Sequence, residues 1–189
     1  MTAAGPSSRP PAAERFSVIA MTGSRAAEVA RALASELTGL AAQAFAAPPW
    51  NETPAHARQL TGQILADAGQ PAFVLALAFT GRGPALAGFC YGITRWPLPG
   101  TVGTWPGSNS PEPFELCELA VLPAARGQGA GRALHDAIIA ASGSQPRWLV
   151  THPAARPAVS LYRASGWQTR HLFPSRADGS TRLLMTRHH

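Results

Sequence analysis

The stretch Leu119-Ala-Val-Leu-Pro-Ala-Ala-Arg-Gly-Gln-Gly-Ala-Gly-Arg132 runs from an apolar strand through a proline and a glycine-rich turn into a helix. Its three glycines have no β-carbon, so a ligand can come close to the backbone there. The first amides of the helix lack carbonyl partners and lie at the positive end of its dipole, which favours an anion. With Arg126 and Arg132 adding charge, the segment predicts a loop that binds a diphosphate.

Two other glycine-loop motifs fit this segment less well. A P-loop needs a lysine before a serine or threonine, and all sixteen basic residues of this chain are arginine. The dinucleotide-binding fingerprint needs a third glycine where Arg132 stands, and it opens an early βαβ unit rather than following a mostly antiparallel sheet. A glycine-rich helix start that binds no ligand remains an alternative for the loop taken alone.

The pattern around the loop predicts an α/β (α+β) fold. We expect helices over 24–47, 53–69, 129–141 and 157–165, from apolar residues spaced by three or four and from Pro54 at a helix start. Strands are expected from about Phe16 and over 72–80, 85–94, 114–122, 147–151, 168–173 and 182–186. Gly81-Arg82-Gly83-Pro84 indicates a hairpin. The fold is therefore a mixed, mostly antiparallel sheet of about seven strands flanked by about four helices.

Length and composition predict one domain. The chain has 189 residues, of which 46% are hydrophobic, which is enough for a single core over 16–189. Residues 1–15 are rich in Ala, Pro, Ser and Gly without periodicity, and we expect them to be a disordered lead-in. The long loop 95–113 is either a functional flap or simply mobile.

Charge and cysteine content restrict the partners. A net charge of +6 suits a polyanionic cofactor, nucleic acid or membrane, but the arginines are scattered, so nucleic acid is not favoured. No apolar run is long enough for a membrane span and no secretion signal is visible, so a cytoplasmic protein is expected. Cys90 and Cys117 lie in separate apolar stretches, which favours free thiols over a disulfide or a metal site.

Two linked motifs resemble the GNAT superfamily of N-acetyltransferases. Arg126-x-x-Gly129-x-Gly131, after its strand, is similar to the acetyl-CoA signature of that superfamily. Ala158-x-x-Leu161-Tyr162-x-x-x-Gly166-Trp167 resembles the helix beside the sulfur end of the cofactor. The spacing of the motifs and the order of elements also agree, over roughly 16–187. The resemblance implies a GNAT-like fold, acetyl-CoA as cosubstrate, no metal, and transfer of acetyl to a primary amine by direct attack.

The resemblance also implies site residues. The backbone of the strand would pair with the pantetheine arm, and the loop would hold the pyrophosphate; these residues are Leu119, Ala120, Val121, Arg126, Gly127, Gln128, Gly129, Ala130, Gly131 and Arg132. Tyr162 matches the tyrosine that protonates the departing thiolate, although a tyrosine there can also merely pack on the cofactor. The family often has asparagine where Ala155 stands, which puts one contact with CoA in doubt.

An amine is protonated near neutral pH, so acetyl transfer to it needs a base, and Glu118 is the candidate. The alternative is a strand-end carboxylate paired with an arginine. Glu115 lies three residues earlier and would point to the opposite face of a regular strand, unless a bulge intervenes. Together with Glu112 these carboxylates would form an acidic mouth that favours a cationic acceptor, and Glu115 is included among the acceptor-binding candidates.

The resemblance places the acceptor near the connection between the first two helices, where Trp50, Asn51 and Glu52 are candidate contacts. The alternative is that Trp50 anchors this connection against the core. The expected acceptor is a small-molecule or peptide amine, and a homodimer is compatible with the sequence. Two other functions stay open: a noncatalytic acyl-CoA sensor, which would need neither Tyr162 nor Glu118, and acetylation of a nucleic-acid-linked amine such as aminoacyl-tRNA.

Overall fold

The computed structural model describes residues 16–70, 72–81, 83, 85–96, 111–175 and 178–188. Seven strands in this part of the chain form one sheet in the order β1-β2-β3-β4-β5-β7-β6. Their bounds are β1 Phe16–Thr22, β2 Val74–Thr80, β3 Leu86–Thr94, β4 Phe114–Val121, β5 Arg147–Thr151, β6 Gln168–Pro174 and β7 Thr181–Arg187. Only β4 and β5 pair in parallel, which confirms the mixed, mostly antiparallel sheet. The predicted lead-in 1–15 and most of the loop 95–113 lie outside the described residues.

The helices of the described residues are α2 Gly23–Ala32, α3 Ala34–Ala44, α4 Pro54–Asp67, α5 Ala130–Ala141 and α6 Arg156–Ala164. The single helix predicted over 24–47 is instead the pair α2 and α3, which meet at Leu33 with φ −102° and ψ 18°. Helical hydrogen bonds still cross the junction, from Leu33 N to Val29 O at 3.0 Å and from Leu37 N to Leu33 O at 2.9 Å. The junction is therefore a kink, and α3 ends at Ala44, before the two prolines.

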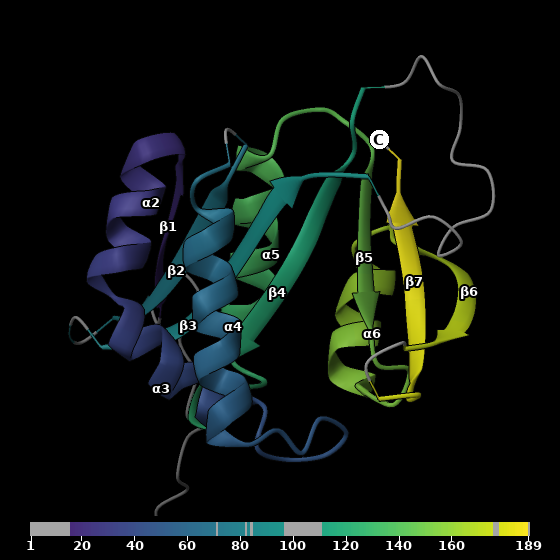
Figure 1. Ribbon diagram of the computed structural model, residues 1–189, viewed down its shortest axis with the longest axis horizontal. Coiled ribbons are helices and arrows are strands. Elements are labelled where there is room, and N and C mark those ends of the chain that lie inside the picture. Colours follow the sequence, from purple (N-terminus) through teal and green to yellow (C-terminus); the bar gives the residue numbers. More distant parts are fainter. Residues whose placement is uncertain are drawn as a thin grey trace, which may run out of the picture.

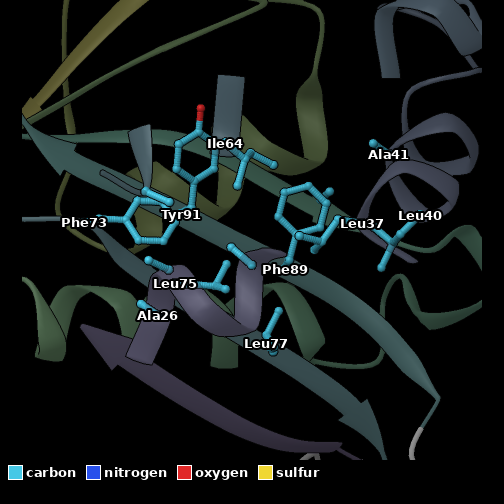
Figure 2. Close-up of a cluster of buried hydrophobic side chains, with 14 of the residues drawn as sticks. Ala26, Leu37, Leu40, Ala41, Ile64, Phe73, Leu75, Leu77, Phe89 and Tyr91 are labelled. Carbon is cyan, nitrogen blue, oxygen red and sulfur yellow. The ribbon is translucent and has the colours of Figure 1, made fainter. Parts of the chain in front are cut away.

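The helices cover both faces of the sheet (Figure 1). On one face, α2, α3 and α4 pack on the central strands, and Figure 2 shows Leu37, Ile64 and Phe89 of this cluster together, with Tyr91 beside Ile64. On the other face, α5 and α6 supply residues such as Leu134 and Ile138. Each large apolar side chain buried in this way contributes about 1.5–3 kcal/mol.

The pairing of β3 with β4 is interrupted by a β-bulge. Tyr91 of β3 lies opposite Glu118, but the next residue, Gly92, lies opposite Leu116. Cys117 is therefore an extra residue in β4, with no partner in β3. A bulge of this kind shifts the alternation of side chains by one residue.

The bulge places the two glutamates of β4 on the same face. Glu118 lies opposite Tyr91 and Glu115 lies opposite Ile93, and both of these β3 residues belong to the cluster under α2–α4. Directly opposed residues on neighbouring strands share a face. The prediction of opposite faces applied to a regular strand, and β4 instead contains the bulge that the sequence analysis named as the exception.

β4 and β5 separate soon after they meet. Their register contains only Phe114 with Arg147 and Glu115 with Trp148. Beyond these pairs the strands diverge, and Figure 1 shows the gap between them widening toward α6. From Leu116 to Val121, the edge of β4 that faces β5 is thus free of strand pairing, which opens the middle of the sheet.

The close approach of β3 and β4 at the bulge yields a first prediction. A β-carbon at Gly92 would overlap the carbonyl oxygen of Glu115 and the ring of Phe114. We expect Gly92→Ala to lower the free energy of unfolding by about 1–3 kcal/mol in urea denaturation. The matched control is Gly62→Ala in α4, where a β-carbon meets nothing within 4 Å and where alanine should add roughly 0.5–1 kcal/mol. A Gly92→Ala protein as stable as the wild type would contradict this packing.

Candidate active site

A cavity of about 530 Å³ opens where β4 and β5 part. It is bounded by the end of α3, the edge of β4, the glycine-rich loop and the starts of α5 and α6. Its lining residues are Ala44, Phe45, Pro48, Pro49, Trp50, Leu119, Val121, Arg126, Gly127, Gly129, Gly131, Arg132, Ala155, Pro157, Ala158 and Leu161. The structure therefore gathers most of the predicted cofactor residues around one cavity.

The glycine-rich loop has the backbone that an anion site needs. Gly127 and Gly129 have φ values of 67° and 97°, in the left-handed region that disfavours other residues. Nothing lies within 4 Å of a β-carbon built on Gly127, so this side of the loop is open. Ala133 N donates to Gly129 O at 3.0 Å, so the amides of residues 130–132 precede the first carbonyl-bonded amide of α5. Free amides at a helix N-terminus suit a diphosphate.

The two arginines beside the loop have structural partners as well as charge. Arg126 donates from Nε to Val121 O at 3.2 Å and from Nη2 to Ala44 O at 2.5 Å. It therefore ties the loop both to β4 and to the end of α3. Arg132 donates to Ser165 Oγ of the α6 C-cap at 3.1 Å. These contacts, which the sequence does not reveal, hold two cationic groups at the wall of the cavity.

The free edge of β4 exposes backbone groups at alternate residues. Leu122 N donates to Ala87 O of β3 at 2.9 Å. Because backbone groups alternate in direction along a strand, those of Ala120, two residues earlier, also point toward β3. The backbone groups of Leu119 and Val121 then point into the cleft, and both residues line the cavity. Ala120 is 1% exposed and packs under α2–α4. An extended ligand arm can pair with Leu119 and Val121, as a strand would.

A second, narrow cavity of about 50 Å³ adjoins the first. It is lined by Phe45, Trp50, Leu116, Cys117, Glu118, Leu119, Val150, Thr151, Ala158 and Tyr162. Four of these residues also line the large cavity, so the two spaces share a wall. The structure thus brings the two predicted catalytic residues to one place, one from β4 and one from α6. Neither Phe45 nor Cys117 was predicted at this site from the sequence. Cys117 lies in the bulge, which local sequence does not reveal.

Burial and neighbouring charge raise the pKa of Glu118 to about 8. Burial is the largest cause, followed by the negative charge of Glu52, and Glu115 adds to it. The backbone amide of Leu119 hydrogen-bonds the carboxylate and lowers the pKa in part. Glu118 forms no ion pair within the described part of the chain, so the arginine-paired alternative is not what the structure contains. A carboxyl with this pKa can take up and release a proton near neutral pH.

Glu115 lies beside the narrow cavity rather than in its wall. It is 8% exposed and forms an ion pair with Arg95. Arg95 is held in turn by Trp148, whose Nε1 donates to the Arg95 carbonyl at 2.9 Å. The charge of Glu115 therefore has an internal counter-ion, which Glu118 lacks.

Tyr162 is buried, with 5% of its surface exposed. Burial, with smaller effects from Cys90 and Glu118, raises its pKa above the usual value for a tyrosine, so the phenol keeps its proton. The ring centroid lies 5.9 Å from that of Trp167 and 6.3 Å from that of His135. No hydrogen bond of the Tyr162 hydroxyl is found among the described residues. The side chain is thus a fixed proton donor without a protein acceptor.

A buried histidine supports Tyr162 from behind, and sequence reasoning missed it. His135 is 0% exposed, and its Nε2 accepts a hydrogen bond from Trp167 Nε1 at 2.9 Å. Its Nδ1 lies 2.8 Å from Asp136 Oδ1. Burial lowers the pKa of His135, which favours the neutral ring. The only available signal was a polar residue beside Leu134 in an apolar helix.

In Figure 1 the connection between α3 and α4 lies below the gap between β4 and α6. Trp50 lines both cavities, and its ring centroid lies 5.9 Å from that of Phe45 and 5.8 Å from that of His152. Trp50 therefore anchors the connection and also forms a cavity wall. Asn51, with φ 50°, and Glu52 line neither cavity. Burial raises the pKa of Glu52.

No group of three histidine, cysteine or acidic residues in the described ranges could hold a metal ion. Both cysteines are free thiols. None of the helices described is long and apolar enough to cross a membrane.

Comparison with known proteins adds a family and a fold. Residues 32–167 match the acetyltransferase (GNAT) family. The structure is similar to one from Corynebacterium glutamicum described as histone acetyltransferase HPA2 and related acetyltransferase. That similarity has a TM-score of 0.65 and 22% identity, over 92% of this chain and 96% of that one. No curated protein matches the sequence.

Two further solved structures have a similar fold. A GCN5-related N-acetyltransferase from Kribbella flavida matches with a TM-score of 0.59 and 18% identity, over 94% of this chain and 99% of that one. The ribosomal-protein-S18-alanine N-acetyltransferase of Escherichia coli matches with a TM-score of 0.59 and 16% identity, over 91% of this chain and 92% of that one. At these identities the similarity concerns the fold.

The raised pKa of Glu118 predicts how stability depends on pH. Between the ordinary value of 4.5 and about 8, the folded chain holds a proton that the unfolded chain has lost. The free energy of unfolding should therefore fall as pH rises through this range. Glu118→Gln lacks this titrating group, so its free energy of unfolding should rise relative to that of the wild type. We expect the difference, measured by urea unfolding, to increase by more than about 1 kcal/mol as the pH rises from about 5 to 8.5. Glu36→Gln, on the exposed side of α3, is the control, and a pH-independent difference for Glu118→Gln would refute the shift.

Proposed function

The chain belongs to the acetyltransferase (GNAT) family, whose members use acetyl-CoA, and we propose that it transfers acetyl from acetyl-CoA to a primary amine. The observation that carries this proposal is the narrow cavity that contains Glu118 and Tyr162 and joins the cavity of the glycine-rich loop. A proton acceptor and a proton donor thus meet where a loop-bound thioester would end.

The residues around the large cavity fit acetyl-CoA. The open backbone at Gly127, the free amides of residues 130–132 and the charges of Arg126 and Arg132 suit its diphosphate. The free edge of β4 at 119–121 suits the amide-containing pantetheine arm of acetyl-CoA. In the loop, Gln128 and Ala130 would contribute only their backbone groups. Ala155 replaces an asparagine that is common in the family and leaves its wall apolar. When bound, acetyl-CoA supplies an activated thioester to an attacking amine.

Glu118 and Tyr162 would divide the proton transfers of the reaction. Glu118 takes the proton that the amine must lose as its nitrogen bonds to the acetyl carbon. Tyr162 gives its phenolic proton to the sulfur as the carbon–sulfur bond breaks. The proton on Glu118 then returns to the Tyr162 oxygen through solvent. An acceptor that binds as an ammonium loses two protons: the first leaves to solvent through Glu118 before the attack, and the second is matched by the proton that Tyr162 gives to sulfur. The products are an N-substituted acetamide, the free thiol and one proton released to solvent.

The local charge supports a cationic acceptor. Glu118 has carboxylates, Glu52 and Glu115, as its charged neighbours, in a chain whose net charge is +6. An arriving ammonium would be the counter-ion that Glu118 lacks. A noncatalytic acyl-CoA sensor would need the large cavity alone, so the second cavity supports an enzyme. The nucleic-acid-linked amine has no comparable support, since Arg126 and Arg132 face the cofactor cavity.

The first test of this function is acetyl-CoA binding, followed by release of free thiol with a panel of amines. Loss of the phenol in Tyr162→Phe should lower kcat by about 100-fold while leaving the Kd for CoA unchanged, because the proton donor is lost but the loop is intact. The matched control is Tyr91→Phe, since the hydroxyl of Tyr91 bonds Asp67 at 3.3 Å and lies in neither cavity. Absence of CoA binding, or full activity in Tyr162→Phe, would refute the proposal.

The second test is the pH dependence of transfer. Because Glu118 has a pKa of about 8, its basic form accumulates as pH rises through that value, and kcat/KM should rise with it. An acceptor whose own pKa is near 10.4, as in a lysine side chain, ionises well above the pH at which Glu118 does, so the two effects can be told apart. Glu118→Gln should lack the inflection in kcat/KM near pH 8, and above that pH its kcat/KM should be about 100-fold lower than that of the wild type. Glu36→Gln should retain it, and an unchanged inflection in Glu118→Gln would exclude this base.

A further inference from the structure

Resting on the proposed acetyl transfer, we infer that Trp50 limits the acceptor to a primary amine whose nitrogen is attached to an unbranched CH2 group. The acceptor class would then be alkyl amines of the form R–CH2–NH2. The α-amino groups of amino acids and peptide N-termini other than glycine would be excluded, because the carbon next to their nitrogen carries a side chain. The inference depends on the size of the narrow cavity, on the rigidity of its wall and on its chemistry.

The narrow cavity is too small for a branched amine beside an acetyl group. At about 50 Å³, and with roughly 10–15 Å³ needed for each water-sized group, it holds about four such groups. The carbonyl carbon, carbonyl oxygen and methyl of an acetyl group take most of that space. The remainder accepts the attacking nitrogen. A second substituent on the adjacent carbon would meet the aromatic wall formed by Phe45 and Trp50.

This aromatic wall is held from several elements. The Trp50 ring packs edge-on against Phe45 at the end of α3 and against His152 after β5. The guanidinium carbon of Arg182, in β7, lies 5.8 Å from the Trp50 ring centroid. Arg182 is fixed in turn by Asp178, at 3.1 Å between Nη2 and Oδ2. A substrate cannot displace the indole without breaking contacts on both sides of the cleft.

The chemistry of the cavity suits an aliphatic arm that ends in one cation. Glu118 is its carboxylate, and Tyr162 is a buried residue whose hydroxyl has no partner in the described structure. The other walls are largely apolar, including Leu116, Val150 and Ala158. The nitrogen would bind at Glu118, while the methylene groups that follow contact aromatic carbon.

Two isomeric amines test the inference directly. n-Butylamine and sec-butylamine have the same formula and similar basicity, but only the second is branched next to nitrogen. In the wild type we expect kcat/KM, from thiol release, to favour n-butylamine by at least about 10-fold. Calorimetric titration of each amine into the protein bound to an unreactive acetyl-CoA analogue, in which a methylene group replaces the sulfur, should show the same preference without turnover.

Matched variants assign the preference to Trp50. Trp50→Ala should reduce it to less than about 3-fold by improving sec-butylamine, and Trp50→Phe should reduce it partly if the alanine variant does not fold. Ile19→Ala, on the exposed side of edge strand β1 at 53% exposure, should leave it unchanged.

The outcomes separate this inference from the function on which it rests. Equal use of the two isomers, a preference that survives in both Trp50 variants, or transfer to neither amine by a protein that binds CoA would overturn the inference alone. A protein that does not bind CoA would overturn the proposed function.

Discussion

The bulge at Cys117 is the constraint on which the rest of the site depends. If β4 were a regular strand in which Cys117 also paired with β3, Glu118 would follow the alternation set by Glu115 and turn away from the face of Tyr91. Just after their two paired positions, β4 leaves β5, so the bulged strand also has an edge without a partner. The position of Glu118 and the unpaired edge of β4 therefore both arise where β4 departs from regular pairing, with β3 at the bulge and with β5 beyond Glu115.

Opposite charges are separated along β4. At its end the loop collects free amides and two arginines, which suit a polyanion. In its middle Glu118 lies among carboxylates, and its own proton relieves part of that repulsion. Arg95 neutralises Glu115 and thereby limits the acidic field to the cavity. A cationic amine and an anionic cofactor can thus approach the same strand from regions of matching sign.

Local chemistry explains which features the sequence predicts well. The glycine-rich turn, the Pro54 helix start and the strand periods depend on neighbours in the chain, and the structure confirms the sheet and the loop they indicate. The bulge depends on register with β3, which no local pattern encodes, so the sequence named a bulge as an exception but could not decide the direction of Glu115. The contacts of Trp50 and His135 join residues about a hundred and about thirty positions apart, respectively, and are equally invisible in the sequence.

The same contacts that hold the two halves of the sheet together also shape the reaction site. Because β4 and β5 share so short a register, side chains must span the opening. On one side α5 and α6 are joined by Arg132 with Ser165 and by His135 with Trp167, directly behind Tyr162. On the other side Trp50 reaches from α3 toward β5 and β7. Cleft rigidity and site geometry are therefore linked: a change that loosens either bridge also moves a wall of the narrow cavity that Glu118 and Tyr162 line.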